Sequence, residues 1–369
     1  MHMEQRQWNR PIMILLIILG LTLSVGGLYS PVAAEDASPA MARPSLDQAL
    51  EKYDARTQVS GILRVAGSDT MRPLMNRFAT EFTGRQPNAK IKVEGGGSGV
   101  ALPEFLNKPK TVRPKNVPPW HKEPPPPALV VASSRELTAE EIKQFVATHG
   151  YEPTAVPIAM DAVGIYVHKD NPIQGLSLEQ LDAILSTTRK RGYPQAIKTW
   201  DQLNLGKGWE QTPIRLYGRN LKSGTRGFVK DHILMNGEFE PSIKEEPGAA
   251  SVILALSRDS SGMAYSGIGL STSSVRAIPL AEAEGKPFIE PSAQNVMNGT
   301  YPLRRFLYLY FDKAPDGSMP QVVEEFLGYI KSRDGQDIVM KGGFYPLSDA
   351  QLDHAVAAVV PTSPPARHP

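Results

Sequence analysis

The pattern of hydrophobic and polar residues along this chain has two forms, one typical of strands and one typical of helices, and the two forms follow each other in turn. Short apolar runs bounded by glycine, proline or polar residues predict strands at 62–67, 89–95, 128–133, 154–172, 214–220, 261–269 and 301–313. Apolar residues spaced four apart, as Leu74, Phe78 and Phe82 are, predict helices between these strands. The alternation predicts an α/β fold with mostly parallel sheets, whose ligands sit at the carboxyl ends of the strands.

Glycine- and hydroxyl-rich loops recur at four junctions where a predicted strand gives way to a helix: 67–70, 95–99, 133–135 and 223–227. The amino end of a helix presents free N–H groups and a partial positive charge, so several such ends aimed at one point bind an anion. Glycine admits a close backbone approach, hydroxyls add donors, and arginine adds a charged planar fork. The four loops therefore predict a local anion site.

Taken singly, most of these loops have an ordinary structural interpretation. "GGGSG" is typical of a flexible turn, "GSDT" of a helix cap, and "ASSREL" of a strand-to-helix turn. The stretch "RNLKSGTRG" at 219–227 is more specific, because it combines two arginines with two hydroxyls at a strand–helix junction. The prediction depends on finding all four loops in one α/β chain.

The composition limits the class of partner. The 369 residues suffice for two lobes with cores of their own. A formal charge of +2 argues against a nucleic-acid binder, which needs a strongly basic face. The chain has no cysteine, which excludes disulfides, thiolate metal sites, a cysteine nucleophile and a lipid-attachment cysteine.

The first 34 residues predict a secretory signal peptide. Arg6 and Arg10 precede the apolar run 11–28, and Val32 to Ala34 form a small-residue cleavage site. We expect cleavage after Ala34 and a soluble protein in a periplasm. The alternative is an uncleaved membrane anchor, since the run is about long enough to span a bilayer.

Three other segments interrupt the strand–helix pattern. Residues 35–60 predict a polar lead-in, and 351–369 a disordered tail. In 107–127, eight of the 21 residues are proline, which predicts an exposed polyproline-like surface loop.

The order of the motifs "GSDTM", "GGGSG", "ASSREL", "MDAVGIYVHKDNP", "RNLKSGTR" and "GMAYSGIG" is similar to that of the substrate-binding proteins of phosphate-specific ABC transporters, over about 61–348. The resemblance implies a two-lobed type II periplasmic binding protein fold with the ligand cleft between the lobes. Lobe one would hold 61–158 and 262–350, lobe two 159–261, and the crossings would lie at 155–167 and 260–268. It also implies a monomer that binds inorganic phosphate and docks on membrane permease subunits, with no catalysis, cofactor or metal.

The resemblance also implies which residues contact phosphate. The most specific match is Arg219-x-x-x-Ser223-Gly224-Thr225, in type and spacing. The loops and the resemblance together predict the phosphate contacts Ser68, Thr70, the backbone N–H of Met71, Ser98, Gly99, Ser134, Arg135, Arg219, Ser223, Gly224 and Thr225.

Two departures from the family pattern concern carboxylates. Some members carry an aspartate where this chain has Ser134, and no acidic residue follows Arg219 within two positions. In those members the aspartate accepts a hydrogen bond from protonated phosphate, which sulfate has no proton to make. We hypothesise that Asp69 or Asp161, which the resemblance places in strand-end loops, takes this role. The structural alternatives are a helix N-cap for Asp69 and a backbone-binding hinge residue for Asp161.

Other functions remain open at this point. The same fold could bind sulfate, molybdate or tungstate, or the proline-rich loop could bind a partner protein. A secreted phosphatase or other hydrolase would use Ser223 or Ser98 as nucleophile and a histidine as base. None of the seven histidines lies beside a serine loop in the sequence, so we expect no enzyme.

Overall fold

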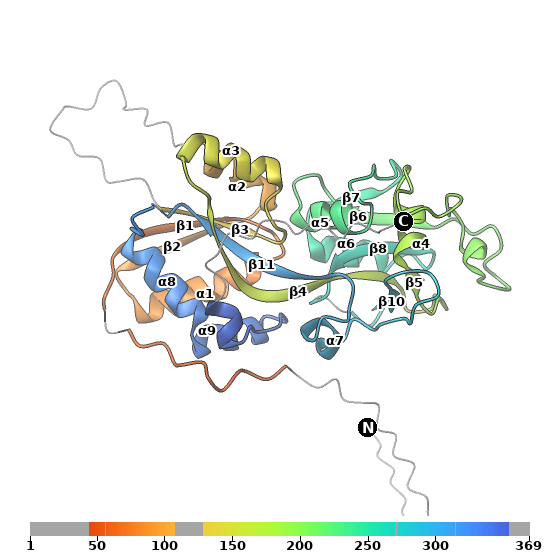
Figure 1. Ribbon diagram of the computed structural model, residues 1–369. Coiled ribbons are helices and arrows are strands. Elements are labelled where there is room, and N and C mark those ends of the chain that lie inside the picture. Colours follow the sequence, from red (N-terminus) through yellow and green to blue (C-terminus); the bar gives the residue numbers. More distant parts are fainter. Residues whose placement is uncertain (1–43, 56, 108–127, 270–271, 314, 354–369) are drawn as a thin grey trace, which may run out of the picture. The chain divides into compact units, whose positions relative to one another are not determined.

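The computed structural model describes residues 44–55, 57–107, 128–269, 272–313 and 315–353 (Figure 1). The predicted signal peptide with its cleavage after Ala34, the proline-rich loop except residue 107, and the tail from 354 onward lie outside the described residues. Within these ranges, no helix is long and apolar enough to cross a membrane.

The strands form a nine-stranded sheet in the order β2-β1-β3-β11-β4-β8-β6-β7, with β9 also paired to β4, and a separate β5–β10 pair (Figure 1). All seven predicted strands are present. The strand bounds are β1 Gly61–Gly67, β2 Ala89–Glu94, β3 Ala128–Ser133, β4 Thr154–His168, β5 Leu176–Ser177, β6 Arg215–Arg219, β7 Lys244–Glu246, β8 Gly262–Gly267, β9 Val275–Ala277, β10 Leu280–Ala281 and β11 Arg304–Phe311.

The helices connect these strands. Helices α1, α8 and α9 lie on one side of β1 and β3, and α2 and α3 lie on the other (Figure 1). The helix bounds are α1 Arg72–Arg85, α2 Ser98–Leu106, α3 Ala139–His149, α4 Leu178–Leu185, the 3-10 helix Trp200–Leu203, α5 Gly224–His232, α6 Ala249–Leu256, α7 Ala293–Met297, α8 Gln321–Lys331, α9 Arg333–Lys341 and α10 Asp349–Asp353.

Local sequence signals explain where several helices begin. Capping boxes, in which side chain and backbone bond each other reciprocally, start α3 at Thr138 with Glu141 and α4 at Ser177 with Gln180. Pro73 occupies the first turn of α1, where its missing N–H costs nothing.

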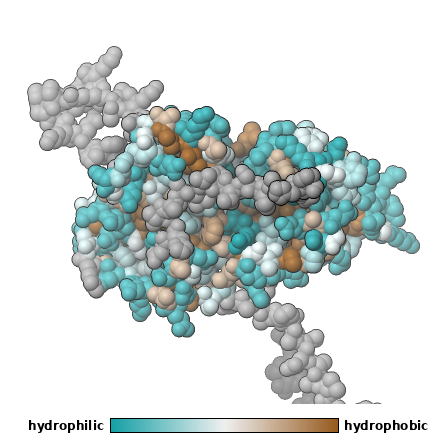
Figure 2. Space-filling view, in the orientation of Figure 1, coloured by the Kyte–Doolittle hydropathy of each residue, from teal (hydrophilic) through white to brown (hydrophobic). Residues whose placement is uncertain are grey.

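The two largest of the four hydrophobic clusters among the described residues pack against different parts of the sheet. One lies around α1 and α8, where Phe82 packs edge-on against Phe326 with ring centroids 5.3 Å apart. The other lies around α4, β8 and Trp200. The surface face in Figure 2 is mainly hydrophilic, with small hydrophobic areas.

The sheet is mixed, which corrects the expectation of mostly parallel strands. The pairs β1–β2, β1–β3, β6–β7 and β6–β8 are parallel. Strand β11 runs antiparallel to β3 and β4, and β4 runs antiparallel to β8 and β9. The 15-residue β4 pairs with β11 along its first half and with β8 along its second, so it is shared by both groups of parallel strands.

Strand pairing also corrects the boundary that we expected at residue 262. Strand β8 pairs with β6 and with the second half of β4, and Ile278 and Leu303 pack in the same core as Trp200. The chain returns to β3 only with β11, and not at 260–268. An apolar pattern shows that a segment is a strand, but it does not encode which strand it pairs with, which explains the error.

The predicted edges of the lead-in and the tail differ as well. Residues 351–353 belong to α10, and Leu352 is buried in the core around Trp200, so these three residues are not disordered as we expected. In the lead-in, the Tyr53 ring packs edge-on against Tyr329, 5.1 Å between centroids. Both segments are held by apolar side chains within otherwise polar sequence.

Candidate functional site

Loops from distant parts of the sequence meet at one place. The hydroxyl oxygens of Thr70, after β1, and Thr225, in the first turn of α5, lie 3.3 Å apart. The Ser134 backbone N–H donates to Ser98 Oγ at 3.2 Å, which joins the loop after β3 to the start of α2. A Cβ at Gly224 would lie only 2.3 Å from Ser98 Oγ and 2.6 Å from Ser134 Oγ, so glycine is required there. All four predicted loops therefore converge.

Two of the helices that begin here, α1 and α2, have N-cap residues, Met71 and Gly97, that make no side-chain capping bond. Helix α5 is capped, because Ser223 Oγ accepts from the Arg226 N–H at 3.4 Å. The Arg72 and Gly99 N–H groups at the starts of α1 and α2 already donate to the Ser68 and Lys222 carbonyls. The three helix ends still place partial positive charge at the convergence point, which favours an anion.

Arg219, at the end of β6, is buried with two donors unused. Its side chain is 1% exposed, and Nη2 donates to Asp69 Oδ2 and to the Pro247 carbonyl, both at 3.3 Å. Nε and Nη1 are buried and have no partner in the described structure. Burial lowers the pKa of the Arg219 guanidinium below its ordinary value, because the charged form loses its hydration. A bound anion would satisfy both donors and the charge.

Asp69 supplies the carboxylate that the sequence next to Arg219 lacks. Its Oδ2 faces Arg219 Nη2, and its Oδ1 accepts from the Gly96 N–H at 2.8 Å. Asp69 is not the N-cap of α1, which was the structural alternative for this residue, since that position is Met71. Asp69 instead ties the first two loops to Arg219.

Asp161 lies in the middle of β4 and not in a strand-end loop, which corrects our placement. Its Oδ2 accepts from Arg305 Nη2 at 2.6 Å and from Nε at 2.9 Å. Arg305 Nη1 donates to Thr225 Oγ1 at 3.0 Å, so the pair is connected to the loops. Asp161 is fully buried, Arg305 is 5% exposed, and Asp161 Oδ1 has no partner.

Our sequence analysis missed Arg305. A signal was available, because Asp161 is the only acidic residue within the apolar run of β4 and Arg305 follows Arg304 into an apolar strand. Arg305 lies two and four residues before Leu307 and Leu309, so it is on the same face of the strand as these two buried side chains. A strand residue in that phase points to the core, where a charge needs a partner.

Two arginines of the loops are already paired. Arg135 donates to both oxygens of Glu141, at 2.7 and 2.8 Å, and to the Glu136 carbonyl at 2.6 Å. Arg226 forms an ion pair with Glu245 at 3.1 Å and lies over the Phe239 ring at 4.1 Å. Unlike Arg219, neither Arg135 nor Arg226 has a buried donor without a partner among the described residues.

Several other predicted groups hold the loops together. Ser68 Oγ accepts from the Met71 N–H at 3.4 Å. The Gly99 N–H donates to the Lys222 carbonyl at 3.1 Å, which joins the start of α2 to the loop before α5. These bonds fix the backbone around the site.

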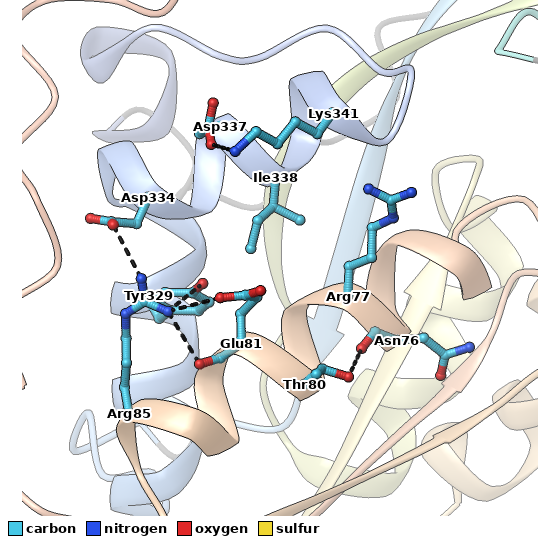
Figure 3. A pocket seen from close by; sticks show the side chains of 10 residues that line it. All are labelled: Asn76, Arg77, Thr80, Glu81, Arg85, Tyr329, Asp334, Asp337, Ile338 and Lys341. Atoms are coloured by element: carbon cyan, nitrogen blue, oxygen red, sulfur yellow. Dashed lines mark hydrogen bonds and ion pairs between the residues drawn. The ribbon is translucent and has the colours of Figure 1, made fainter.

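One cavity lies next to the convergence point, and another lies elsewhere in the molecule. One of about 130 Å³ has Arg305 in its wall, together with Arg135, Phe228 and His232. Another of about 490 Å³ lies between α1 and helices α8 and α9 (Figure 3). In the second, Arg85 is paired with Glu81 and Asp334, as Figure 3 shows, so this cation is already neutralised.

Histidine and metal chemistry find little support in the described part of the chain. His232 stacks on Phe228 with ring centroids 3.9 Å apart, and burial lowers its pKa below the ordinary value. Among the described residues, no three His, Asp or Glu side chains are grouped so that they could hold a metal ion.

The chain is similar in sequence to known binding proteins. The model of a family described as the PBP superfamily domain matches residues 53–334. The chain is 40% identical over 317 residues to the phosphate-binding protein PstS of Pseudomonas aeruginosa, which covers 86% of this chain and 93% of that protein. It is 25% identical over 296 residues to the phosphate-binding protein PstS of Bacillus subtilis, covering 80% and 84%.

A solved structure shows the same fold. An ABC-type phosphate transport receptor from Vibrio cholerae superposes with a TM-score of 0.57 at 20% identity, covering 78% of this chain and all of that one. The two-lobed binding-protein fold that the sequence motifs implied is thereby confirmed.

Proposed function

The chain belongs to the PstS family of phosphate-binding proteins within the PBP superfamily, and we propose that it binds inorganic phosphate and delivers it to an ABC-type importer. The observation that carries the proposal is the pair of unused donors on the buried Arg219. Buried polar groups in folded proteins nearly always have partners, so two unused donors on one cation indicate a missing anion.

We assign direct contacts to groups that are free to turn toward that anion. Arg219 provides Nε and Nη1, and the amino ends of α1 and α2 provide partial positive charge. The hydroxyls proposed as ligands are those of Thr70, Ser98, Ser134 and Thr225. Hydroxyls suit this role because they can rotate from each other to a ligand.

The remaining predicted residues act around the ligand in this proposal. Gly224 allows the loops to approach, and Ser68, Met71, Gly99 and Ser223 fix the loop backbones. Arg135 braces α3 through Glu141 and is left out of the direct contacts. The candidates for the acceptor carboxylate stay Asp69, whose oxygens already accept from Gly96 and Arg219, and Asp161, which has one oxygen without a partner in the described structure.

Export and docking extend the proposal beyond the site. We infer that the protein acts as a periplasmic monomer after removal of residues 1–34 and that permease subunits accept its phosphate. A deletion strain should lose high-affinity phosphate uptake, and amino-terminal sequencing of the exported protein should begin at Glu35. Unchanged uptake in the deletion strain would contradict delivery to an importer.

Binding without turnover is the form of activity that we propose. The relatives are named as binding proteins, and His232 is stacked on Phe228 instead of facing a serine. The purified protein should release no phosphate from phosphate esters. Turnover that is lost in Ser223→Ala would favour a hydrolase.

Calorimetry on the exported protein, stripped of bound anion, tests the proposal directly. We expect one-to-one binding of phosphate that sulfate and molybdate do not displace. Binding of sulfate or molybdate in place of phosphate would keep the fold and change the ligand. Absence of binding by any oxyanion would overturn the function.

A further inference from the structure

Arg226 lies in the first turn of α5, seven residues after Arg219, and its side chain reaches back to the end of β6. Its Nη1 donates to the main-chain carbonyl of Arg219 at 3.0 Å. The same nitrogen forms the ion pair with Glu245 at 3.1 Å, and the side chain is only 12% exposed. Because hydrogen bonds from charged donors are stronger than those between neutral groups, this contact restrains the residue that carries the unused donors.

The peptide unit that follows Arg219 is held at both of its ends. Arg226 donates to its oxygen, and its N–H, which belongs to Asn220, donates to the Glu246 carbonyl at 3.3 Å. Since a peptide unit is planar, bonds at both ends set its orientation. The pairing of β6 with β8 ends at Tyr217 and does not reach Arg219. The Arg226 side chain therefore supplies a restraint that pairing with β8 does not provide there.

Aromatic rings hold Arg226 in this position. Its guanidinium lies over the Phe239 ring, with Cζ 4.1 Å from the ring centroid. Phe239 stacks on the fully buried Tyr265, with ring centroids 6.1 Å apart. Tyr265 packs against Gly218, where a Cβ would lie only 2.6 Å from the ring and its hydroxyl oxygen. These contacts run from Arg226 back to the residue before Arg219, so both neighbours of the Arg219 backbone are fixed.

The far end of the Arg219 side chain is also bonded, through Nη2, to Asp69 and to the Pro247 carbonyl. With Nη2 and the main-chain carbonyl both bonded, the free Nε and Nη1 have a defined direction. Arg226 itself has no buried donor without a partner among the described residues. Its contacts suit a group that orients Arg219 better than they suit a second ligand for the anion.

We propose that Arg226 is a positioning residue for anion binding, which orients Arg219 through its main-chain carbonyl and makes no contact with the anion. This inference rests on the proposed function, since it needs an anion to bind at Arg219. A donor that is already oriented loses less freedom when the anion arrives, so it binds the anion more tightly. The effect of Arg226 on affinity should therefore depend on the presence of the Arg219 fork.

Calorimetric titration of phosphate into the anion-stripped wild type, Arg226→Met, Arg219→Met and the double variant tests this dependence. We expect Arg226→Met to lower phosphate affinity by about tenfold when Arg219 is present and by less than about twofold when it is methionine. An equal loss in both backgrounds would mean that Arg226 acts on the anion directly or only supports the fold. Unchanged affinity in Arg226→Met would mean that Arg219 needs no such restraint. Either result would overturn the inference.

Arg226→Met combined with Glu245→Gln is the matched control, because it restores the net charge of the wild type without restoring the bond to Arg219. We expect the same tenfold loss, and a return to wild-type affinity would show that only charge matters, which contradicts the inference.

A second variant keeps the test valid if Arg226→Met does not fold, which thermal unfolding of the anion-free proteins checks. Arg226→Lys still donates a hydrogen bond but lacks the planar fork, so we expect a smaller loss with the same dependence on Arg219. The wild type separates this inference from the proposed function. Its failure to bind phosphate would overturn the function, whereas phosphate binding with equal losses in both backgrounds would overturn only the role of Arg226.

Discussion

Two arginine–aspartate pairs border the site, and they are built in opposite ways. Arg219 and Asp69 lie at strand ends and in loops, joined by a single contact of 3.3 Å. Arg305 and Asp161 lie within strands, joined by two shorter bonds on one oxygen. In the first pair the arginine has unused donors, and in the second the aspartate has an unused acceptor.

The difference indicates a division of roles. Arg219 has two unused donors of its planar fork, which suit an incoming anion. Asp161, held between strands, keeps one carboxylate oxygen without a donor. The two arginines and two aspartates have no net formal charge. An anion at this site would therefore be stabilised mainly by oriented hydrogen-bond donors and helix amino ends, and not by an excess of positive charge.

Removing the Arg219 fork should have the largest effect on binding. In Arg219→Met we expect phosphate affinity to fall by about thirtyfold or more, since truncating a buried charged partner costs about 2–5 kcal/mol. Without anion, the unfolding free energy should change by less than about 1 kcal/mol, because removing two buried unsatisfied donors offsets the loss of the Nη2 bonds to Asp69 and the Pro247 carbonyl. Denaturant unfolding with and without phosphate measures both quantities.

Arg219→Lys is the control for this prediction. It retains the charge without the planar fork, so it should recover only part of the affinity. If Arg219→Met bound phosphate as the wild type does, the free donors of Arg219 would have no role in binding.

Removing the Arg305 fork should instead affect folding. Arg305→Met leaves the carboxylate of Asp161 buried without a partner, and we expect the unfolding free energy to fall by about 3–5 kcal/mol. The double variant Asp161→Leu with Arg305→Met should recover most of this loss, as apolar replacements of a buried pair do. Urea unfolding of the anion-free wild type, single variants and double variant measures this double-mutant cycle. If Arg219→Met and Arg305→Met lost the same unfolding free energy, the two pairs would not differ in their contribution to folding.

The sequence predicted a role for Arg219 and Asp69, but it did not predict the pairing of Arg305 with Asp161. Arg219 lies in a motif in which glycines, hydroxyls and spacing all point to an anion. The pair of Asp161 with Arg305 depends on the register between strands that are 144 residues apart, and single-chain patterns do not fix such a register. The same limit explains the misplaced boundary at 262, since β8 was recognised as a strand but its partners were not.

A third arginine–aspartate pair, Arg215 with Asp259, lies outside the site and should affect binding least. Arg215 Nε donates to Asp259 Oδ2 at 2.6 Å, and Tyr217 Oη donates to the same oxygen at 2.8 Å. Burial opposes ionisation of Asp259, but hydrogen bonds from Arg215, Tyr217 and Ser261 outweigh it and lower the pKa of its carboxyl from 3.8 to about 2.

A lowered pKa makes this contribution to stability sensitive to acid. Because the folded state binds the proton less readily than the unfolded state, the stabilisation is complete above about 3.8 and is lost as the pH falls toward about 2. We expect Asp259→Asn to unfold at lower urea concentration than the wild type at pH 6, with the gap narrowing between pH 4 and pH 2. Phosphate affinity at pH 7 should change by less than about twofold, since the effect of a distant pair is independent of the site. A gap that stays constant with pH would show that the ionised carboxylate of Asp259 adds nothing to stability, and a loss of phosphate binding would show that this pair is not separate from the other two.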